Sequence, residues 1–283
     1  MIRSLLLLVG FLSLASGEPA VSPGLHADIE YRNVDGESLC LDASVPLGDG
    51  PFPAAILIHG GGWGSGDKAQ DFGALAKPLN EAGIAWFSIN YRLAPRHPWP
   101  AGFEDVQAAI RWVKANAAAY RIDPRRLALV GYSAGGQLAT LAAIRADESL
   151  RVQAVVGLAP AVDLVADSRR RGEVSVALRN LLGLPPELDD AALAKIAAIS
   201  PAEEVKAGMP PFLIVQGTAD KSVRHEDAVA FVKRLEGVKV PCVFSEMRGA
   251  PHRIADWEKF APDYPATVAG WLKATLKETP AAK

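Results

Sequence analysis

Short apolar runs recur along the chain, and segments with helical spacing separate them. The runs at 54–58 and 154–158 contain no polar side chain, which is typical of strands buried on both faces of a sheet. Between such runs, apolar residues such as Val106, Ile110 and Val113 lie three or four positions apart, and this spacing predicts helices. The alternation predicts an α/β fold with a mainly parallel sheet and helices on both faces. The predicted strands are 27–33, 39–45, 54–58, 84–89, 127–130, 154–158, 212–216 and 240–246, and the predicted helices are 71–82, 103–118, 137–144, 228–235 and 266–276.

Two parts of the chain depart from this alternation. The first two strands are separated by Asp35-Gly36, a turn signal that predicts an antiparallel hairpin at the start of the sheet. The stretch at about 161–207 holds short helical runs, Pro185-Pro186 and three consecutive arginines at 169–171. We interpret it as an insertion within one domain, 18–283, that helps to shape a ligand site above the strand ends. The arginines favour a solvated face over an anion site.

The N-terminus has the features of a secretory signal. Arg3 precedes the apolar run 5–12, and small residues follow at 13–17. This pattern predicts a signal peptide over residues 1–17 and a secreted or periplasmic protein with no membrane contact after cleavage. The run is shorter than the ~20 residues that span a bilayer. An uncleaved anchor or a buried first helix remains the alternative.

Composition narrows the classes of function. The chain has 283 residues, 49% of them hydrophobic, and a formal net charge of −2. These values predict one large globular domain and give no reason to expect nucleic acid or an acidic membrane surface as a partner. The two cysteines, Cys40 and Cys242, both lie in predicted strands, and buried free thiols are favoured over a disulfide. The oligomeric state stays open.

A candidate nucleophile lies between the strand 127–130 and the helix 137–144. The sequence Gly131-Tyr132-Ser133-Ala134-Gly135 fits the G-x-S-x-G elbow, in which a tight turn raises the serine hydroxyl above the sheet. The following helix begins there, and its N-terminal N–H groups favour developing negative charge. An ordinary turn serine is the alternative.

A serine needs a base, and the base needs an orienting acid. Among five histidines, His252 follows the strand 240–246 in a loop at its carboxyl end, whereas the alternative, His225, opens a helix. Asp220 directly follows the strand 212–216, and the order Ser, Asp, His suits this topology. The sequence therefore predicts Ser133, Asp220 and His252 as catalytic residues. If Asp220 is not the orienting acid, the alternatives are Glu246 and Asp256.

A glycine-rich turn, HGGG at 59–62, follows the strand 54–58. Small residues let backbone N–H groups converge on one point, so we predict an oxyanion hole of Gly61 and Gly62 with the Ala134 N–H. A phosphate loop is excluded, because Asp67 stands where that motif needs lysine. The chain has no H-E-x-x-H motif or Cys/His cluster, so neither a metal nor another cofactor is expected.

With these motifs, the sequence resembles the α/β-hydrolases, and within them the hormone-sensitive-lipase-like esterases with an HGGG turn. Four stretches over about 28–275 are similar to secreted bacterial esterases, including acetyl xylan and feruloyl esterases; they are 59–68, 90–95, 131–136 and 217–223. The resemblance implies a secreted serine carboxylesterase for short or aromatic acyl esters, such as acetyl or feruloyl groups on plant polysaccharide. Trp63, Tyr132 and parts of 161–207 are expected to wall its pocket, although core packing is nearly as strong an interpretation of the two aromatics. The alternatives are an amidase, peptidase or lactonase, and more remotely a non-catalytic binding protein.

The sequence departs from that family in three places. The helical cap that usually precedes the first strands is missing, which predicts an open site. Asn90 stands where the family often has aspartate, which leaves the charge partner of Arg92 open. The turn that carries the base often has the pattern Gly-x-Gly-His-Gly, whereas here Pro251 stiffens it and Arg253 places a charge beside His252.

Overall fold

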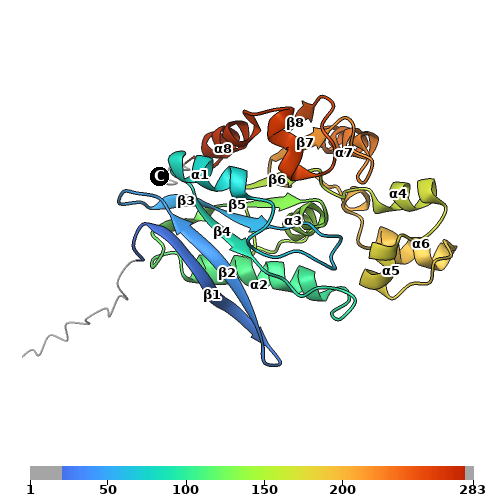
Figure 1. The fold of residues 1–283 in the computed structure, drawn as a ribbon, viewed down its shortest axis with the longest axis horizontal. Coiled ribbons are helices and arrows are strands. Elements are labelled where there is room, and N and C mark those ends of the chain that lie inside the picture. The colour runs from blue at the N-terminus through green and yellow to red at the C-terminus, as the bar shows by residue number, and fades with distance from the viewer. Residues whose placement is uncertain (1–20, 278–283) are drawn as a thin grey trace, which may run out of the picture.

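The computed structural model describes residues 21–277, and the predicted signal peptide at 1–17 lies outside them. Within these residues, eight strands form one sheet in the order β1-β2-β4-β3-β5-β6-β7-β8 (Figure 1). β2 pairs antiparallel with β1 and β4, and every other neighbouring pair is parallel. The mainly parallel sheet with an initial hairpin is therefore confirmed. The strands are β1 (Gly24–Val34), β2 (Glu37–Val45), β3 (Phe52–Ile58), β4 (Ala85–Ile89), β5 (Ile122–Tyr132), β6 (Ala154–Leu158), β7 (Phe212–Gly217) and β8 (Cys242–Met247).

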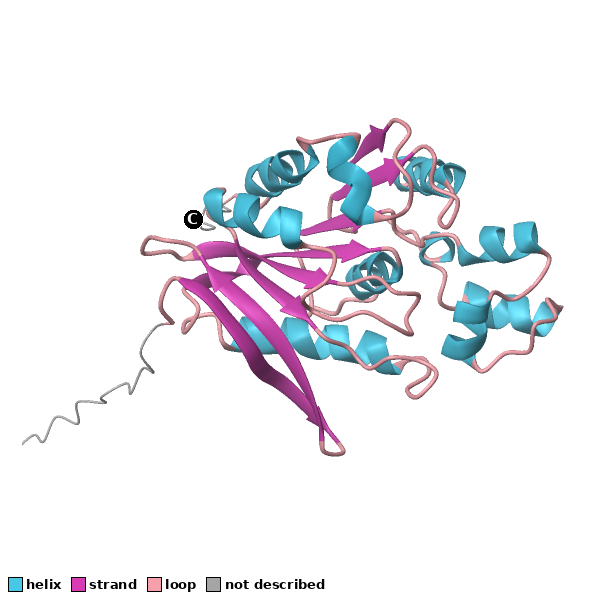
Figure 2. Ribbon diagram, in the orientation of Figure 1, coloured by secondary structure: helices cyan, strands magenta, loops and turns pink. Residues whose placement is uncertain are grey.

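Helices cover both faces of the sheet (Figure 2). The buried residues of α1 and α8 belong to one hydrophobic core, and those of α2, α3 and α7 belong to the other. The strands β4, β6 and β7 are buried along their whole length, as their apolar runs predict. The helices are α1 (Gly73–Glu81), α2 (Ala101–Ala115), α3 (Ala134–Ile144), α4 (Leu164–Arg171), α5 (Val176–Leu182), α6 (Asp190–Ala197), α7 (His225–Gly237) and α8 (Tyr264–Thr275), with short 3₁₀ helices at Pro201–Glu203 and Ile254–Lys259.

The segment between β6 and β7 carries α4, α5 and α6, which Figure 1 shows beyond the carboxyl ends of the parallel strands. Asp163, Ser175 and Asp189 each accept a hydrogen bond from the N–H three residues further on, as N-cap residues do. The two ends of the segment are joined, because the Ala202 N–H donates to the Val162 carbonyl at 2.9 Å. The three helices therefore form an insertion whose two ends are hydrogen-bonded to each other.

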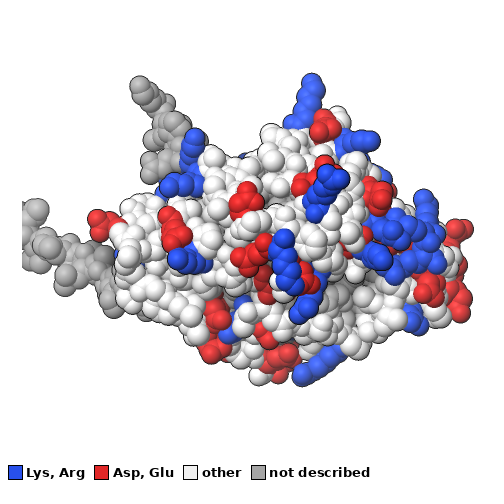
Figure 3. Space-filling model, turned by 45° about the horizontal axis from the view of Figure 1, so that its top comes forward, with Lys and Arg blue, Asp and Glu red and all other residues white. Residues whose placement is uncertain are grey.

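The arginine run at the end of α4 is engaged in ion pairs. Arg170 donates to both oxygens of Asp227, at 3.0 and 2.6 Å, and to Asp167 at 3.1 Å. Arg171 donates through Nε to Asp167 at 2.7 Å. Figure 3 shows basic and acidic side chains interspersed over the face that it displays. Two of the three arginines thus pair with neighbouring carboxylates, and all three residues are exposed, as the sequence predicts.

The two cysteines are free thiols in distant parts of the sheet. Cys40 lies on β2, near one edge, and Cys242 begins β8 at the opposite edge. The free thiols are as the sequence predicts, and both residues are partly buried. Burial raises the pKa of the Cys242 thiol to about 12. Among residues 21–277, no helix combines the length and apolar character needed to cross a bilayer.

Candidate active site

Ser133 lies in a sharp turn between β5 and α3. Its backbone has φ 52° and ψ −115°, a conformation that costs a non-glycine residue about 1–3 kcal/mol. Surrounding hydrogen bonds hold this conformation. The Ser133 N–H donates to Leu158 O at 2.9 Å, and the Ser133 carbonyl accepts from the N–H groups of Ala161 and Gln137, both at 3.2 Å. The turn is therefore fixed from β6 and from the start of the inserted segment.

The glycines of the elbow are required by close packing. A Cβ atom on Gly131 would lie 2.2 Å from the Gly135 carbonyl oxygen, and one on Gly135 would lie 2.0 Å from the Ile58 carbonyl oxygen. Both distances are far inside van der Waals contact. The elbow therefore packs against itself and against the last residue of β3, from which the glycine-rich turn departs.

The structure brings together the three predicted catalytic side chains. His252 Nε2 lies 3.0 Å from Ser133 Oγ, and His252 Nδ1 lies 2.7 Å from Asp220 Oδ2. Because a carboxylate only accepts, Nδ1 carries the proton and Nε2 is left to accept from the serine hydroxyl. This arrangement lets His252 remove the proton from Ser133 as the oxygen attacks.

Asp220 is held rigidly at the end of β7. Its side chain is fully buried. Oδ1 accepts from the N–H groups of Ser222 and Val223 at 2.8 and 2.9 Å, while Oδ2 accepts from Gln216 Nε2 at 3.1 Å in addition to His252. Both oxygens are thus occupied, and the one that faces the imidazole is fixed in direction.

The alternative acids, Glu246 and Asp256, and the alternative base, His225, form hydrogen bonds elsewhere. His225 begins α7, and its Nε2 lies 2.5 Å from Glu246 Oε1. Asp256 accepts from Lys259 at 2.5 Å on the 3₁₀ helix that follows the base. None of these three side chains contacts Ser133 or His252, so the geometry favours Asp220 as the orienting acid.

Asp220→Asn is expected to lower kcat for ester hydrolysis by about 10³- to 10⁴-fold, because an amide nitrogen facing Nδ1 stabilises the wrong imidazole tautomer. Glu246→Gln is the matched control, since it neutralises a carboxylate on the neighbouring strand that the base does not touch. Steady-state kinetics on a chromogenic acetate ester measure both variants. An equal loss in the two would contradict the role of Asp220.

The glycine-rich turn lies against the nucleophile. A Cβ atom on Gly60 would lie 3.3 Å from Ser133 Cβ. Gly61 and Gly62 have φ values of +107° and +58°, which place their N–H groups away from the usual strand partners. Within the described chain, neither of these two N–H groups has an acceptor. The Ala134 N–H, at the first position of α3, also lacks an acceptor within its helix. These donors are the ones predicted to bind an oxyanion.

Two polar side chains, those of Asp71 and His59, support this turn. Asp71 Oδ2 accepts from the Gly60 N–H at 2.8 Å. The His59 ring is buried, stacks on Tyr91 at 4.3 Å, and places Nδ1 2.7 Å from the Gly60 carbonyl oxygen. Burial lowers the pKa of His59, which keeps the imidazole neutral at pH 7. Neutral His59 can donate through Nδ1 to the Gly60 carbonyl, which fixes the start of the turn.

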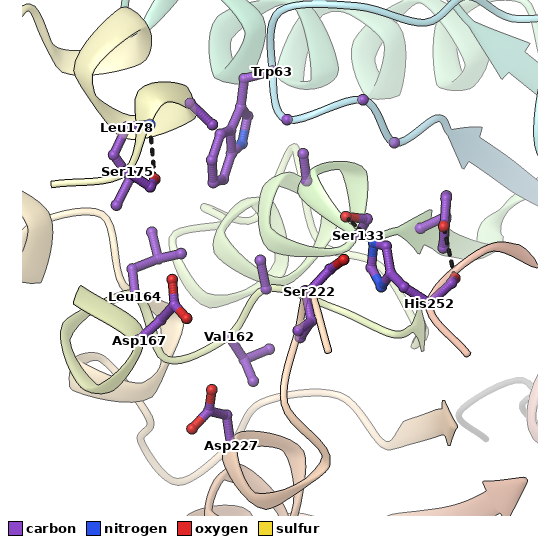
Figure 4. Close-up of a pocket in the computed structure, with 18 of the residues that line it drawn as sticks. Trp63, Ser133, Val162, Leu164, Asp167, Ser175, Leu178, Ser222, Asp227 and His252 are labelled. Atoms are coloured by element: carbon purple, nitrogen blue, oxygen red, sulfur yellow. Dashed lines mark hydrogen bonds between the residues drawn. The ribbon is translucent and has the colours of Figure 1, made fainter. Parts of the chain in front are cut away.

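A cavity of about 500 Å³ opens onto Ser133 and His252 (Figure 4). Trp63, Leu164 and Leu178 form apolar parts of its wall, and Asp167 and Asp227 lie at the end away from Ser133. Residues of α4 and α5 wall one side of the site, which the sequence predicts to be open. No three His, Cys, Asp or Glu side chains of residues 21–277 are grouped so that they could hold a metal ion.

Both predicted substrate-binding aromatics line this cavity and are also part of the core. Trp63 is 6% exposed, and its Nε1 donates to Gln137 Oε1 at 3.0 Å. Tyr132 is 7% exposed and stacks on His252 with ring centroids 5.3 Å apart. Its hydroxyl donates to the His252 carbonyl at 2.8 Å, so it also fixes the loop that carries the base.

Two departures from the family pattern are resolved by local partners. Arg92 pairs with Asp105 of α2, with Nε 2.9 Å from Oδ2, while Asn90 accepts from the Lys68 N–H. The Arg253 side chain is 77% exposed and lies 3.9 Å from Asp256. The charge beside the base is therefore mostly solvated.

Sequence reasoning missed Asp71, Gln137 and Asp227, and it placed parts of 161–207 in the pocket wall without naming Asp167. Asp71 lies in a loop, where no periodicity marks a functional side chain. Gln137 could have been noticed, because it is a polar residue in a helix whose residues are all buried. Asp167 and Asp227 come from segments whose approach depends on how the insertion folds back.

Comparisons with known proteins agree with this architecture. A model of the BD-FAE family matches residues 41–235. Esterase LipC of Mycobacterium tuberculosis is 34% identical over 221 residues, which are 71% of this chain and 53% of LipC. The chain spans about half the length of the curated relatives that it matches.

Two solved structures extend the similarity to the whole fold. A truncated carbohydrate esterase from gut microbiota has a TM-score of 0.80 at 25% identity and covers 92% of this chain and 100% of its own. Esterase Est2 of the Planctomycetes species Thermogutta terrifontis has a TM-score of 0.74 at 27% identity, with 92% and 96% covered. The family model alone matches well over half of the chain. The chain therefore belongs to the BD-FAE family and has the α/β-hydrolase fold.

Proposed function

We propose that this protein is a serine carboxylic ester hydrolase. The observation that carries the proposal is the hydrogen-bonded series Ser133, His252 and Asp220 beside the unpaired N–H groups of Gly61 and Gly62. A nucleophile, its base and an oxyanion site in one cavity are the parts that acyl transfer to a serine requires. The names of the relatives LipC and Est2 as esterases point to the same reaction.

The proposed reaction has two halves. Ser133 Oγ attacks the ester carbonyl while His252 takes its proton, and the oxyanion that forms binds the N–H groups of Gly61, Gly62 and Ala134. His252 then gives the proton to the leaving alcohol, and an acyl group remains on Ser133. Water attacks this acyl-enzyme with the same base, which releases the acid and restores the serine.

We propose short or aromatic acyl groups on a hydroxyl-rich alcohol, such as acetyl or feruloyl groups on plant polysaccharide. The far end of the cavity carries Asp167 and Asp227, whose oxygens disfavour a long apolar chain and can accept hydrogen bonds from sugar hydroxyls. One similar structure is a carbohydrate esterase, and Est2 has been solved with propionate and with butyrate bound. These relatives support the class of substrate.

We further propose that the protein acts outside the cytoplasm, since residues 1–17 have the pattern of a signal peptide. N-terminal sequencing of the protein from the periplasm and the medium tests this, and an intact Met1 in the exported protein would contradict cleavage.

A substrate panel tests the proposed activity. We expect kcat/KM for p-nitrophenyl acetate and butyrate to exceed that for the dodecanoate by about tenfold or more, because the carboxylates at the far end of the cavity disfavour a long apolar chain. Matched p-nitroanilides separate an esterase from an amidase, and a fluorophosphonate probe should label Ser133. Faster cleavage of the anilides, or no labelling of Ser133, would contradict the proposal.

A further inference from the structure

The oxyanion turn ends at Trp63, whose backbone conformation is energetically unfavourable for a residue with a side chain. Gly61, Gly62 and Trp63 have consecutive positive φ values of +107°, +58° and +61°. The first two are glycines, which adopt such values readily, but Trp63 carries a side chain and does so only when its surroundings enforce it. The conformation of Trp63 sets the path of the chain that leaves the oxyanion donors, so whatever holds Trp63 also holds the donors.

The Trp63 side chain is held by one buried polar contact. Its Nε1 donates to Gln137 Oε1 at 3.0 Å, and Gln137 is completely buried one turn after Ser133 on α3. Gln137 Nε2 donates in turn to the Ile199 carbonyl at 2.8 Å, where the chain returns from α6. The single amide thus links the oxyanion turn, the helix that follows the nucleophile, and the exit of the inserted segment.

We propose that Gln137 is a positioning residue that fixes the oxyanion donors through the Trp63 indole. The inference rests on the proposed esterase function. A buried amide has a fixed direction for its acceptor oxygen because its nitrogen is committed to Ile199. The indole can meet that oxygen only from one side, which selects the strained backbone at Trp63. The Gly64 and Ser65 N–H groups also hold the turn, through the Gly61 carbonyl at 3.1 Å, so loss of the indole contact loosens the Gly61 and Gly62 donors without unfolding the turn.

Gln137→Met keeps the length of the side chain and removes both hydrogen bonds, and Trp63→Phe keeps an aromatic ring but removes the donor. Each is expected to lower kcat for p-nitrophenyl acetate by about 10- to 100-fold, below the loss reported for deleting a whole oxyanion donor, with little change in KM. The double variant should lose no more activity than the less active of the two single variants, because both substitutions remove the same contact.

Thr140→Val is the matched control. Thr140 is also completely buried on α3, and its hydroxyl donates to Gly136 O within the helix without contacting the turn. We expect its kcat to remain close to wild type even if its melting temperature falls. If Gln137→Met does not give folded protein, Trp63→Phe decides, because it removes the Nε1 donor and leaves the Gln137 amide bonded to the Ile199 carbonyl.

The inference is overturned if Gln137→Met leaves kcat unchanged, if the loss appears in KM, or if the two single losses add in the double variant. Any of these results with an active wild type leaves the proposed function intact. A wild-type protein without esterase turnover overturns the proposed function and the positioning role together.

Discussion

Ser133→Ala is expected to abolish ester hydrolysis, with kcat lowered by about 10⁴- to 10⁶-fold. The hydroxyl is the only part of the side chain that is removed, and the backbone of the elbow keeps its hydrogen bonds to Leu158, Ala161 and Gln137. The melting temperature should therefore stay close to that of the wild type. Turnover of p-nitrophenyl acetate and thermal unfolding, followed on the same preparation, measure the two effects.

The fluorophosphonate adduct supplies the control for this variant. Intact mass should increase for the wild type and stay unchanged for Ser133→Ala, which shows that the lost activity and the lost nucleophile are the same group. Activity retained by the folded variant would contradict the assignment of Ser133, and unfolding of the variant would show that the serine has a structural role.

Gly135→Ala is expected to lower the free energy of unfolding by about 3 kcal/mol or more, near the upper end of the range for overpacked sites. The added Cβ would lie 2.0 Å from the Ile58 carbonyl oxygen and 2.4 Å from the His59 carbonyl oxygen. Both clashing atoms belong to backbone, so no side chain can rotate to make room. α3 would have to move off the end of β3, which also separates the elbow from the oxyanion turn. Urea unfolding measures the loss.

Gly270→Ala is the matched control for this prediction. Gly270 lies within α8, and a Cβ there would have no neighbour within 4 Å. Alanine is a better helix former, so this variant should gain about 0.5–1 kcal/mol of stability. Similar unfolding curves for Gly135→Ala and the wild type would mean that the elbow and β3 are less tightly packed than described.

The sequence predicts the sheet well where strands are buried, because a strand covered on both faces must be apolar throughout. β6 has the predicted bounds, 154–158. β5 begins at Ile122, five residues before the predicted start. The prediction began too late because Asp123, Arg125 and Arg126 interrupt the apolar pattern. Those polar residues lie in the strand nonetheless, with Ile122 paired to Phe52 of β3.

The site residues could be predicted because each follows a strand, and the carboxyl ends of parallel strands meet at one edge. The distances between them, and the choice of Asp220 over Glu246, depend on how loops fold around β7 and β8. Asp105, the partner of Arg92, lies near the start of a helical pattern, where a carboxylate is common and gives no signal of a partner. The cavity wall likewise required knowing how α4 and α5 return to the sheet.

Hydrogen bonds at both ends of the inserted segment allow the residues between them to change without moving the nucleophile. Its entry is bonded to Ser133 through the Ala161 N–H, its exit to Gln137 through the Ile199 carbonyl, and its two ends to each other through Val162 and Ala202. Length changes in a loop whose ends are already fixed cost little. Residues between these anchors can be exchanged, shortened or extended to suit a new alcohol while the nucleophile stays in place. Under the proposed function, the residues between the anchors carry the selectivity for the alcohol, and the anchored frame carries the chemistry.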